Sequence, residues 1–255
     1  GGAVVTGYRA ALEEGADVIA KIDGDGQMDP ALVPGFVAPI LAGEADYTKG
    51  NRFHTLHGVR AMPPVRLFGN AALSFLTKVS SGYWTVFDPT NGYTAVHASA
   101  LRSFELGTLA ERYFFESDLL IKLGAVRAVV LDVPMESRYA DEVSGLSVRR
   151  ILGQFLWRHL YSTVRRVVYS YFVRDFNLAS LNLLAGVPLL LFGLTFGILT
   201  WAESLRTGTP ATTGTVMLSV LPIVLGVQLC LFFASYDVAN EPRRPLQRWA
   251  RLKER

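Results

Sequence analysis

The stretch KIDGDGQMDP at residues 21–30 places three carboxylates directly after the apolar run ADVIA at residues 16–20. Carboxylates this crowded repel one another and raise each other's pKa unless a cation or hydrogen-bond donors share the site. In α/β folds, ligands bind at the carboxyl ends of the strands. We therefore expect residues 17–22 to form a strand, with a functional site directly after it.

The first half of the chain alternates segments of helical and strand pattern. Helices are predicted up to Gly15, from Asp29 to about Leu41, over residues 65–79 and over residues 111–125, and further strands over residues 45–53 and 126–139. This alternation indicates an α/β domain with a mostly parallel sheet. Because such a sheet does not normally open with a helix, we expect the first strands of the domain to be missing from residues 1–255.

Two long apolar runs dominate the second half of the 255-residue chain, half of whose residues are hydrophobic. Residues 181–202 and 215–236 carry no charge, and each run of about 22 residues is long enough to cross a bilayer. The link at 203–214 has a single arginine, whereas the outer flanks are rich in arginine, which favours a cytoplasmic location for both flanks. We predict an integral protein of the inner or plasma membrane with two transmembrane helices and with its first domain and C-terminus in the cytoplasm.

Arginine pairs alternate with Leu, Phe, Trp and Tyr at helical spacing in residues 147–176. Such a basic amphipathic segment is typical of the membrane interface, although a long helix packed on a soluble core would show the same pattern. The isoelectric point near 9.0 comes from arginines beside the apolar runs, so we expect a membrane surface and no nucleic acid as the anionic partner. The predicted organisation is a first domain at 1–146, an interfacial segment at 147–176, a transmembrane hairpin at 177–236 and a basic tail at 237–255.

The acidic cluster has several chemical interpretations. An EF-hand calcium loop is excluded, because Met28 stands where that loop needs glycine and Pro34 where it needs glutamate. A haloacid dehalogenase-type phosphatase would use Asp23 and Asp25 as nucleophile and acid, but that pattern has Thr or Val at the place of Gln27. A solvated acidic turn that caps a helix stays open. The remaining interpretation is a site for a nucleotide sugar, whose diphosphate leaving group needs Mg²⁺ or Mn²⁺ held by hard oxygen ligands.

Several motifs together resemble family 2 glycosyltransferases of the dolichol-phosphate mannosyltransferase or bacterial polyprenyl-phosphate glycosyltransferase type. They are TGYRAAL (6–12), DGDGQMDP (23–30), KGNRF (49–53), DPTNGYTAVH (88–97), VPMESRY (133–139), the GLS turn (145–147) and YFVRDFNLASLNLLAG (171–186). The resemblance spans nearly the whole chain. It implies an A-type, Rossmann-like glycosyltransferase domain without its first strands, followed by the interfacial segment and the transmembrane hairpin.

The resemblance also implies roles for the residues that match these motifs. The divalent cation, Mg²⁺ or Mn²⁺, would be held by Asp23, Asp25 and Gln27, with Asp25 also counted as catalytic. The donor diphosphate would be bound by Asp23, Arg52, Arg66 and Asn70. The acceptor phosphate would be met by Arg138, Ser147 and Arg149. Arginine suits these tasks because its planar guanidinium binds phosphate through two parallel hydrogen bonds.

The implied reaction moves one sugar from a nucleotide diphosphate sugar to a dolichyl or undecaprenyl phosphate, with inversion at the anomeric carbon. A phosphate monoester loses its second proton near a pKa of ~6, so the acceptor can attack without a protein base. Asp88 is the one carboxylate kept as a catalytic orienting group, and a turn-capping role is the alternative for it.

Two other functions stay open. A catalytically inactive membrane-anchored scaffold or assembly partner would suit a chain without the first strands. A processive polysaccharide synthase would carry Gln-x-x-Arg-Trp, whose last two residues are reversed in QFLWR at 154–158. We also expect that Gly186, Gly193 and Gly197 allow close helix packing, which would permit a homo-oligomer.

Overall fold

The structure, a computed structural model, describes the chain except residues 25, 27, 55–63, 136–147 and 254–255 and the side chains of 64–66, 148–152 and 250–253. Two compact units make up the chain, and we describe each by itself. The first comprises Gly1–Arg166 together with Glu241–Arg255, and the second comprises Val167–Asn240. The chain therefore leaves the first unit after Arg166, forms the second unit and returns to the first unit at Glu241.

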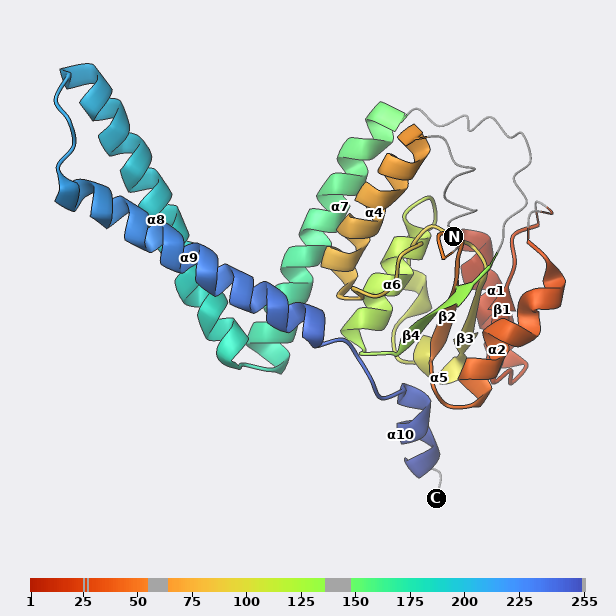
Figure 1. The fold of residues 1–255 in the computed structure, drawn as a ribbon. Coiled ribbons are helices and arrows are strands. Elements are labelled where there is room, and N and C mark those ends of the chain that lie inside the picture. Colours follow the sequence, from red (N-terminus) through yellow and green to blue (C-terminus); the bar gives the residue numbers. More distant parts are fainter. Residues whose placement is uncertain (25, 27, 55–63, 136–147, 254–255) are drawn as a thin grey trace. The chain divides into compact units, whose positions relative to one another are not determined.

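A four-stranded sheet with the order β1-β3-β2-β4 forms the centre of the first unit (Figure 1). The strands are β1 (Val18–Lys21), β2 (Tyr47–Asn51), β3 (Thr94–His97) and β4 (Val130–Pro134). β2 and β4 are parallel, but β3 is antiparallel to both β1 and β2, so the sheet is mixed and not mostly parallel as expected. The physical reason is that the connection from β2 to β3, which includes α4 (Pro64–Ser81), returns through residues 88–93 to the edge at which β2 ends, so β3 runs in the opposite direction.

Helices cover both faces of this sheet, which confirms the predicted α/β class. The helices of this unit are α1 (Gly2–Glu13), η1 (Pro30–Leu32), α2 (Val33–Leu41), α4 (Pro64–Ser81), α5 (Ala98–Leu101), η2 (Leu106–Thr108), α6 (Phe115–Ala125), α7 (Val148–Val168) and α10 (Leu246–Lys253). Alternate residues of β3 point to opposite faces: Val96 joins a core with α1 and α6, and Ala95 joins a second core with α2. Asp29 begins the helical segment as predicted, because its Oδ1 accepts a hydrogen bond from the Ala31 amide.

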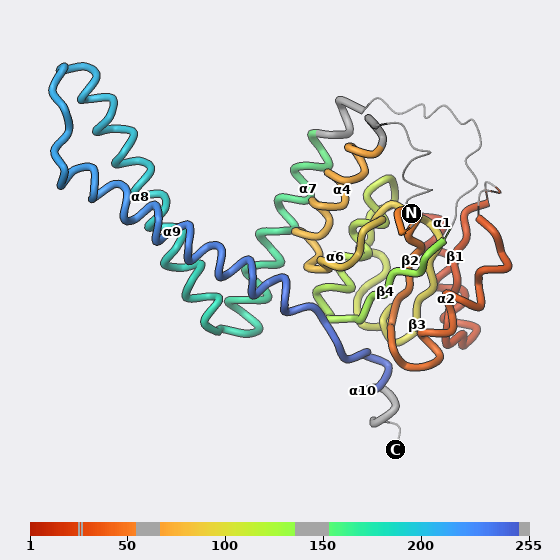
Figure 2. Tube along the Cα trace, viewed as in Figure 1, coloured from red at the N-terminus to blue at the C-terminus, as the bar shows by residue number. Residues whose placement is uncertain are grey.

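One face of α7 packs against the rest of the first unit. α4 and α7 run side by side (Figures 1 and 2), and His159 Nδ1 of α7 lies 2.9 Å from Ser80 Oγ of α4. Arg166 donates two hydrogen bonds from α7 to the Val79 carbonyl. Other residues of α7 are exposed, among them Trp157, Leu160, Tyr161 and Val164. One face of α7 thus packs as the alternative of a helix on a soluble core expects. The first compact unit extends to Arg166, whereas the predicted boundary lies between residues 146 and 147.

His159 makes the stability of the first unit depend on pH. Burial among Ser80, Phe114 and Phe155 lowers its pKa from 6.5 to about 4. Between these values the unfolded chain binds a proton that the folded chain does not, so stability falls as the pH drops from 6.5 to about 4. Relative to His159→Phe, we expect the wild type to lose about 1.4 kcal/mol per pH unit across this window. Denaturant unfolding of both proteins at several pH values measures the difference, and a difference that does not change with pH contradicts the assignment.

The second unit is a helical hairpin. It contains η3 (Tyr169–Arg174), α8 (Leu178–Thr207) and α9 (Thr213–Ala239). α8 and α9 are each long and apolar enough to cross a membrane, and they contain the predicted spans 181–202 and 215–236. Tyr171 donates a 2.6 Å hydrogen bond to Asp237, which joins η3 to the last turns of α9.

Glycines bring the two hairpin helices close together. A Cβ on Gly193 would lie 2.7 Å from Ile223 Cγ1, and a Cβ on Gly226 would lie 2.7 Å from the backbone nitrogen of Leu190. A Cβ on Gly186 would meet Leu229 at 2.9 Å, and one on Gly197 would meet Ser219 Oγ at 2.3 Å. The predicted close packing thus occurs within one hairpin, and the homo-oligomer stays a prediction.

Candidate functional site

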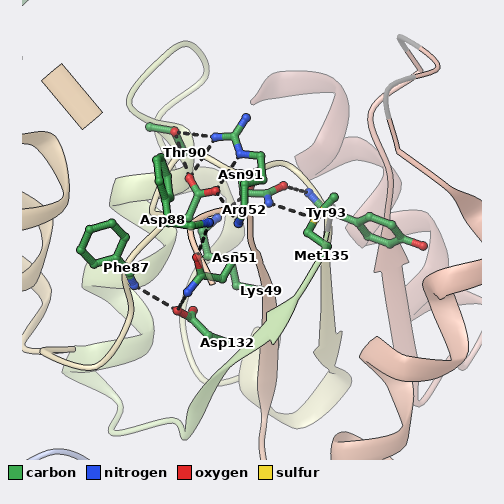
Figure 3. Close-up of polar contacts among 11 residues, drawn as sticks. Lys49, Asn51, Arg52, Phe87, Asp88, Thr90, Asn91, Tyr93, Asp132 and Met135 are labelled. Carbon is green, nitrogen blue, oxygen red and sulfur yellow. Dashed lines mark hydrogen bonds and ion pairs between the residues drawn. The ribbon is translucent and has the colours of Figure 1, made fainter. Parts of the chain in front are cut away.

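The described residues of three motifs, DGDGQMDP, KGNRF and DPTNGYTAVH, gather at one edge of the sheet. β1, β2 and β4 end at this edge, and β3 begins there. Residues that follow β1, β2 and β4 therefore face the turn that precedes β3, as the close-up in Figure 3 shows for β2, β4 and that turn. These residues thus lie at the edge where β1 ends, and the functional site expected there stays a prediction.

Arg52 and Asp88 form a two-pronged ion pair at the end of β2. Arg52 Nε lies 2.7 Å from Asp88 Oδ2, and Arg52 Nη2 lies 2.9 Å from Asp88 Oδ1 (Figure 3). The Arg52 amide also donates to Asp88, and Nη2 is 3.4 Å from Thr90 Oγ1. The Asp88 side chain is 1% exposed and that of Arg52 is 17% exposed. The pair fixes the plane of the guanidinium, so the structure brings together two residues that the sequence singled out separately.

Asp132 is a second carboxylate at this edge, and the sequence analysis missed it. Its Oδ2 accepts hydrogen bonds from Asn51 Nδ2 at 2.9 Å and from the Phe87 amide at 3.1 Å. Its Oδ1 is buried and has no hydrogen-bond partner within the described part of the chain. Burial raises the pKa of this carboxyl group. A carboxylate inside the apolar run VRAVVLDVP was the signal that could have revealed it.

Lys49 places a buried ammonium group under the turn that precedes β3. Its side chain is fully buried, and Nζ donates a hydrogen bond to the Asn91 carbonyl. Burial lowers its pKa from 10.5 to about 8, against the opposing effect of nearby carboxylates, chiefly Asp88. Asn91 in turn accepts from the Tyr93 amide and donates to Met135 Sδ at 3.1 Å. A lysine inside the strand pattern of YTKGN was the available signal, and it was also missed.

Asp23 links the acidic motif to this turn. Its Oδ1 lies 3.1 Å from Lys21 Nζ, which also lies 3.3 Å from Glu116 Oε1 on α6. On the other side it packs against Gly92, where an added Cβ would stand 1.8 Å from Asp23 Oδ2. The turn therefore has room for the Asp23 carboxylate only because residue 92 is glycine.

The described residues provide one of the three predicted ligands for the divalent cation. Asp23 offers a half-exposed carboxylate in a glycine-lined cradle, and carboxylate oxygen is the ligand type that Mg²⁺ and Mn²⁺ prefer. The other two predicted ligands, Asp25 and Gln27, lie outside the described residues. Among the described residues, no group of three His, Cys, Asp or Glu side chains gathers to hold a metal. The cation site thus rests on Asp23 together with the two predicted neighbours.

The remaining predicted residues are distributed over α4, α7 and the segment between β4 and α7. Arg66 and Asn70 lie on α4 four residues apart, so they share one face of that helix. Asn70 is half-buried, whereas the side chain of Arg66 lies outside the described part. Arg149 belongs to the first turn of α7, again without a described side chain. Arg138 and Ser147 lie outside the described residues, so the acceptor side stays a prediction.

Replacing Gly92 by alanine is expected to displace the Asp23 carboxylate without unfolding the domain. The new Cβ would lie 2.5 Å from Asp23 Cγ, and the half-exposed side chain can rotate away toward solvent. We expect a change in the free energy of unfolding below about 1 kcal/mol. A cation site that loses a correctly placed ligand should bind Mn²⁺ at least about 10-fold more weakly. Titration of Mn²⁺ binding and denaturant unfolding measure the two quantities.

The matched control for this change is Gly35→Ala on α2, where an added Cβ meets nothing within 4 Å. That variant should bind Mn²⁺ like the wild type. Equal Mn²⁺ affinity in both alanine variants would show that Asp23 does not contribute to a cation site.

The chain is similar in sequence to two proteins whose names describe sugar transfer with a polyprenyl phosphate. It is 33% identical over 141 residues to UDP-N-acetylglucosamine–dolichyl-phosphate N-acetylglucosaminyltransferase of Methanococcus voltae, covering 55% of this chain and 56% of that protein. It is 28% identical over 136 residues to undecaprenyl-phosphate mannosyltransferase of Micrococcus luteus, covering 53% of this chain and 55% of that protein. The chain spans about half the length of the curated relatives it matches. The resemblance predicted from the motifs is confirmed by these relatives.

The chain was also compared with protein-family models and with solved structures. No family model matches the chain. Among solved structures, glucosyl-3-phosphoglycerate synthase from Mycobacterium tuberculosis is 20% identical with a TM-score of 0.44, over 62% of this chain and 52% of that chain. Because this TM-score is below 0.5, the description of the fold rests on the chain's own topology.

Proposed function

We propose, from this kinship to polyprenyl-phosphate sugar transferases, that the chain belongs to a membrane-bound enzyme that moves one sugar from a nucleotide diphosphate sugar to a polyprenyl phosphate. The observation that carries the proposal is the 33% identity over 141 residues to a protein named as a dolichyl-phosphate N-acetylglucosaminyltransferase. The proposal is also supported by the positions of Asp23, Arg52 and Asp88, which lie at one edge of the sheet. Carboxylates and arginine are the side chains that bind divalent cations and phosphates.

The donor diphosphate would be bound by oxygen ligands and arginine. Asp23, Asp25 and Gln27 would hold a Mg²⁺ or Mn²⁺ ion, which neutralises charge on the diphosphate leaving group. Asp88 holds the guanidinium of Arg52 in a fixed plane, so that little rotational freedom of Arg52 would be lost when it meets a phosphate. Arg66 and Asn70, on one face of α4, would add contacts to the same donor.

The acceptor would react through its own phosphate oxygen. A phosphate monoester with a second pKa of ~6 is largely a dianion at neutral pH, so it can attack the anomeric carbon without a protein base. Arg138, Ser147 and Arg149 would hold this phosphate in line with the leaving group, and a single displacement of this kind inverts the anomeric carbon. The catalytic contribution of the protein is then positioning and charge stabilisation.

The membrane hairpin would keep this chemistry beside the lipid acceptor. The first compact unit contains the chain before and after the hairpin, so both ends of the hairpin would lie on the same side of the membrane. The arginine-rich flanks favour the cytoplasmic side of the inner or plasma membrane. A polyprenyl chain lies within the bilayer, and its phosphate would be met at the interface.

The test is the product formed by the natural full-length protein in isolated membranes. We expect label from one of a panel of radiolabelled nucleotide sugars to enter an organic-soluble lipid that carries a single sugar and releases it in mild acid. Label in an insoluble polymer would instead indicate a processive synthase. Absence of lipid label with every donor, in folded and membrane-inserted protein, would contradict the proposal and favour the scaffold function.

A further inference from the structure

The segment that follows the second span is built into the first compact unit. The carboxylate of Asp46, at the start of β2, is fully buried and accepts hydrogen bonds from the backbone amides of Leu246 and Gln247 at 2.9 and 3.1 Å. Gln247 is 1% exposed, and its side chain donates to the carbonyl groups of Ile40 and Ala45 at 2.9 and 2.7 Å. This part of the predicted basic tail is therefore docked, and it is held by the end of α2 and by the segment that leads into β2.

Glu241 extends this docking to the loop that carries Asp88. Its Oε1 accepts a 2.7 Å hydrogen bond from the Thr85 amide, and its Oε2 accepts a 2.9 Å hydrogen bond from Thr85 Oγ1. Both carboxylate oxygens are thus engaged by one residue of the loop. Hydrogen bonds to a charged acceptor are about twice as strong as those between neutral groups.

The loop 82–88 is attached to the rest of the unit at several places. Its start is fixed by Tyr83, whose buried hydroxyl donates a 2.6 Å hydrogen bond to the Ala128 carbonyl. Its end is fixed by Asp132, which accepts from the Phe87 amide, and by the pairing of Asp88 with Arg52. Between these places the Val86 side chain is buried in the core and the Trp84 ring contacts Phe75, whereas Thr85 is exposed. Glu241 adds a restraint on the backbone and hydroxyl of this exposed residue.

We propose that Glu241 is a positioning residue for the Arg52–Asp88 pair, so that the chain emerging from the second transmembrane helix completes the donor site. Glu241 follows α9 by two residues, and it contacts the loop three residues before Asp88. The hairpin then has a second role besides anchoring, because the donor site reaches its final geometry only when the chain has returned to the first unit. This inference rests on the proposed function for its kinetic consequence, but its structural consequence can be measured without substrate.

The test compares Glu241→Ala and Glu241→Gln with Glu203→Ala in the natural full-length protein. Glu203 is a matched control because it also engages one partner, Arg206, through both carboxylate oxygens, but at the end of α8 in the second unit. Hydrogen exchange in residues 82–91 should become at least about 10-fold faster in Glu241→Ala and less so in Glu241→Gln, whose amide oxygen still accepts one bond. Exchange in α6 should stay unchanged in all three variants.

The kinetic arm measures KM and kcat for the nucleotide sugar. In Glu241→Ala we expect KM to rise about 10-fold with a smaller change in kcat, since Arg52 is displaced from the donor phosphates while the acceptor side is untouched. Thr85→Ser keeps both hydrogen bonds and should retain the wild-type KM.

Three results would overturn the proposal. Unchanged exchange in residues 82–91 would show that Glu241 does not restrain the loop. Faster exchange throughout the first unit would show a general structural role. Faster exchange confined to the loop with an unchanged KM would separate the loop from donor binding. If the wild type transfers no sugar, the proposed function fails, while the exchange measurement still decides whether Glu241 positions the loop.

Discussion

Arg52→Ala is expected to lower the free energy of unfolding of the first unit by about 3–5 kcal/mol, because it leaves the carboxylate of Asp88 buried without its partner. Asp88 is 1% exposed and receives two side-chain hydrogen bonds from Arg52, and the variant removes both of them together with the positive charge. Denaturant unfolding of the membrane protein in detergent measures the loss.

The same arginine is proposed to bind the donor, so stability and activity must be separated. The double variant Arg52→Ala/Asp88→Ala removes the unpaired charge and should recover most of the lost stability without recovering sugar transfer. Arg206→Ala is the matched control, because its ion pair with Glu203 is exposed and should contribute less than about 1 kcal/mol. Recovery of both stability and activity in the double variant would mean that the pair is structural only.

Asp25→Asn is expected to reduce sugar transfer by at least about 100-fold, through loss of charge at the proposed cation site. Asp23→Asn should act in the same direction, and both variants should need more Mn²⁺ or Mg²⁺ to reach their half-maximal rate. The physical reason is that a neutral amide binds a divalent cation less tightly than a carboxylate does. Rate measurements over a range of cation concentrations give both quantities.

Asp29→Asn is the control within the same motif. The Asp29 side chain accepts a hydrogen bond from the Ala31 amide at the start of the helical segment, and asparagine caps helices about as well as aspartate. Transfer by this variant should therefore stay close to the wild-type rate. Equal losses in Asp23→Asn, Asp25→Asn and Asp29→Asn would indicate that the motif acts through folding and not through a cation.

The sequence pattern predicted those features that local chemistry determines. The two spans follow from charge-free runs of sufficient length, and the site edge follows from carboxylates placed directly after an apolar strand. The helix that begins at Asp29 follows from its capping residue and the proline after it. Each of these signals lies within a few residues of the feature that it predicts.

Such local signals do not predict contacts between distant parts of the chain. The partner of Arg52 is Asp88, 36 residues away, and the partner of Glu241 is Thr85, 156 residues away. The reversed direction of β3 and the role of Lys49 likewise depend on which strands become neighbours. A periodic pattern shows that a strand is buried, but it does not show the order or direction in which strands pair.

A comparison of polyprenyl phosphate with polyprenol as acceptors tests whether the sugar is transferred to a lipid phosphate. Membranes that contain the natural full-length protein or its Asp25→Asn variant are incubated with Mn²⁺, a labelled nucleotide sugar and either polyprenyl phosphate or polyprenol, and organic-soluble label is counted. We expect label with polyprenyl phosphate and wild-type protein, at least about 100-fold less label with Asp25→Asn, and none with polyprenol. Equal labelling of the two lipids, or equal labelling by the two proteins, would contradict this expectation.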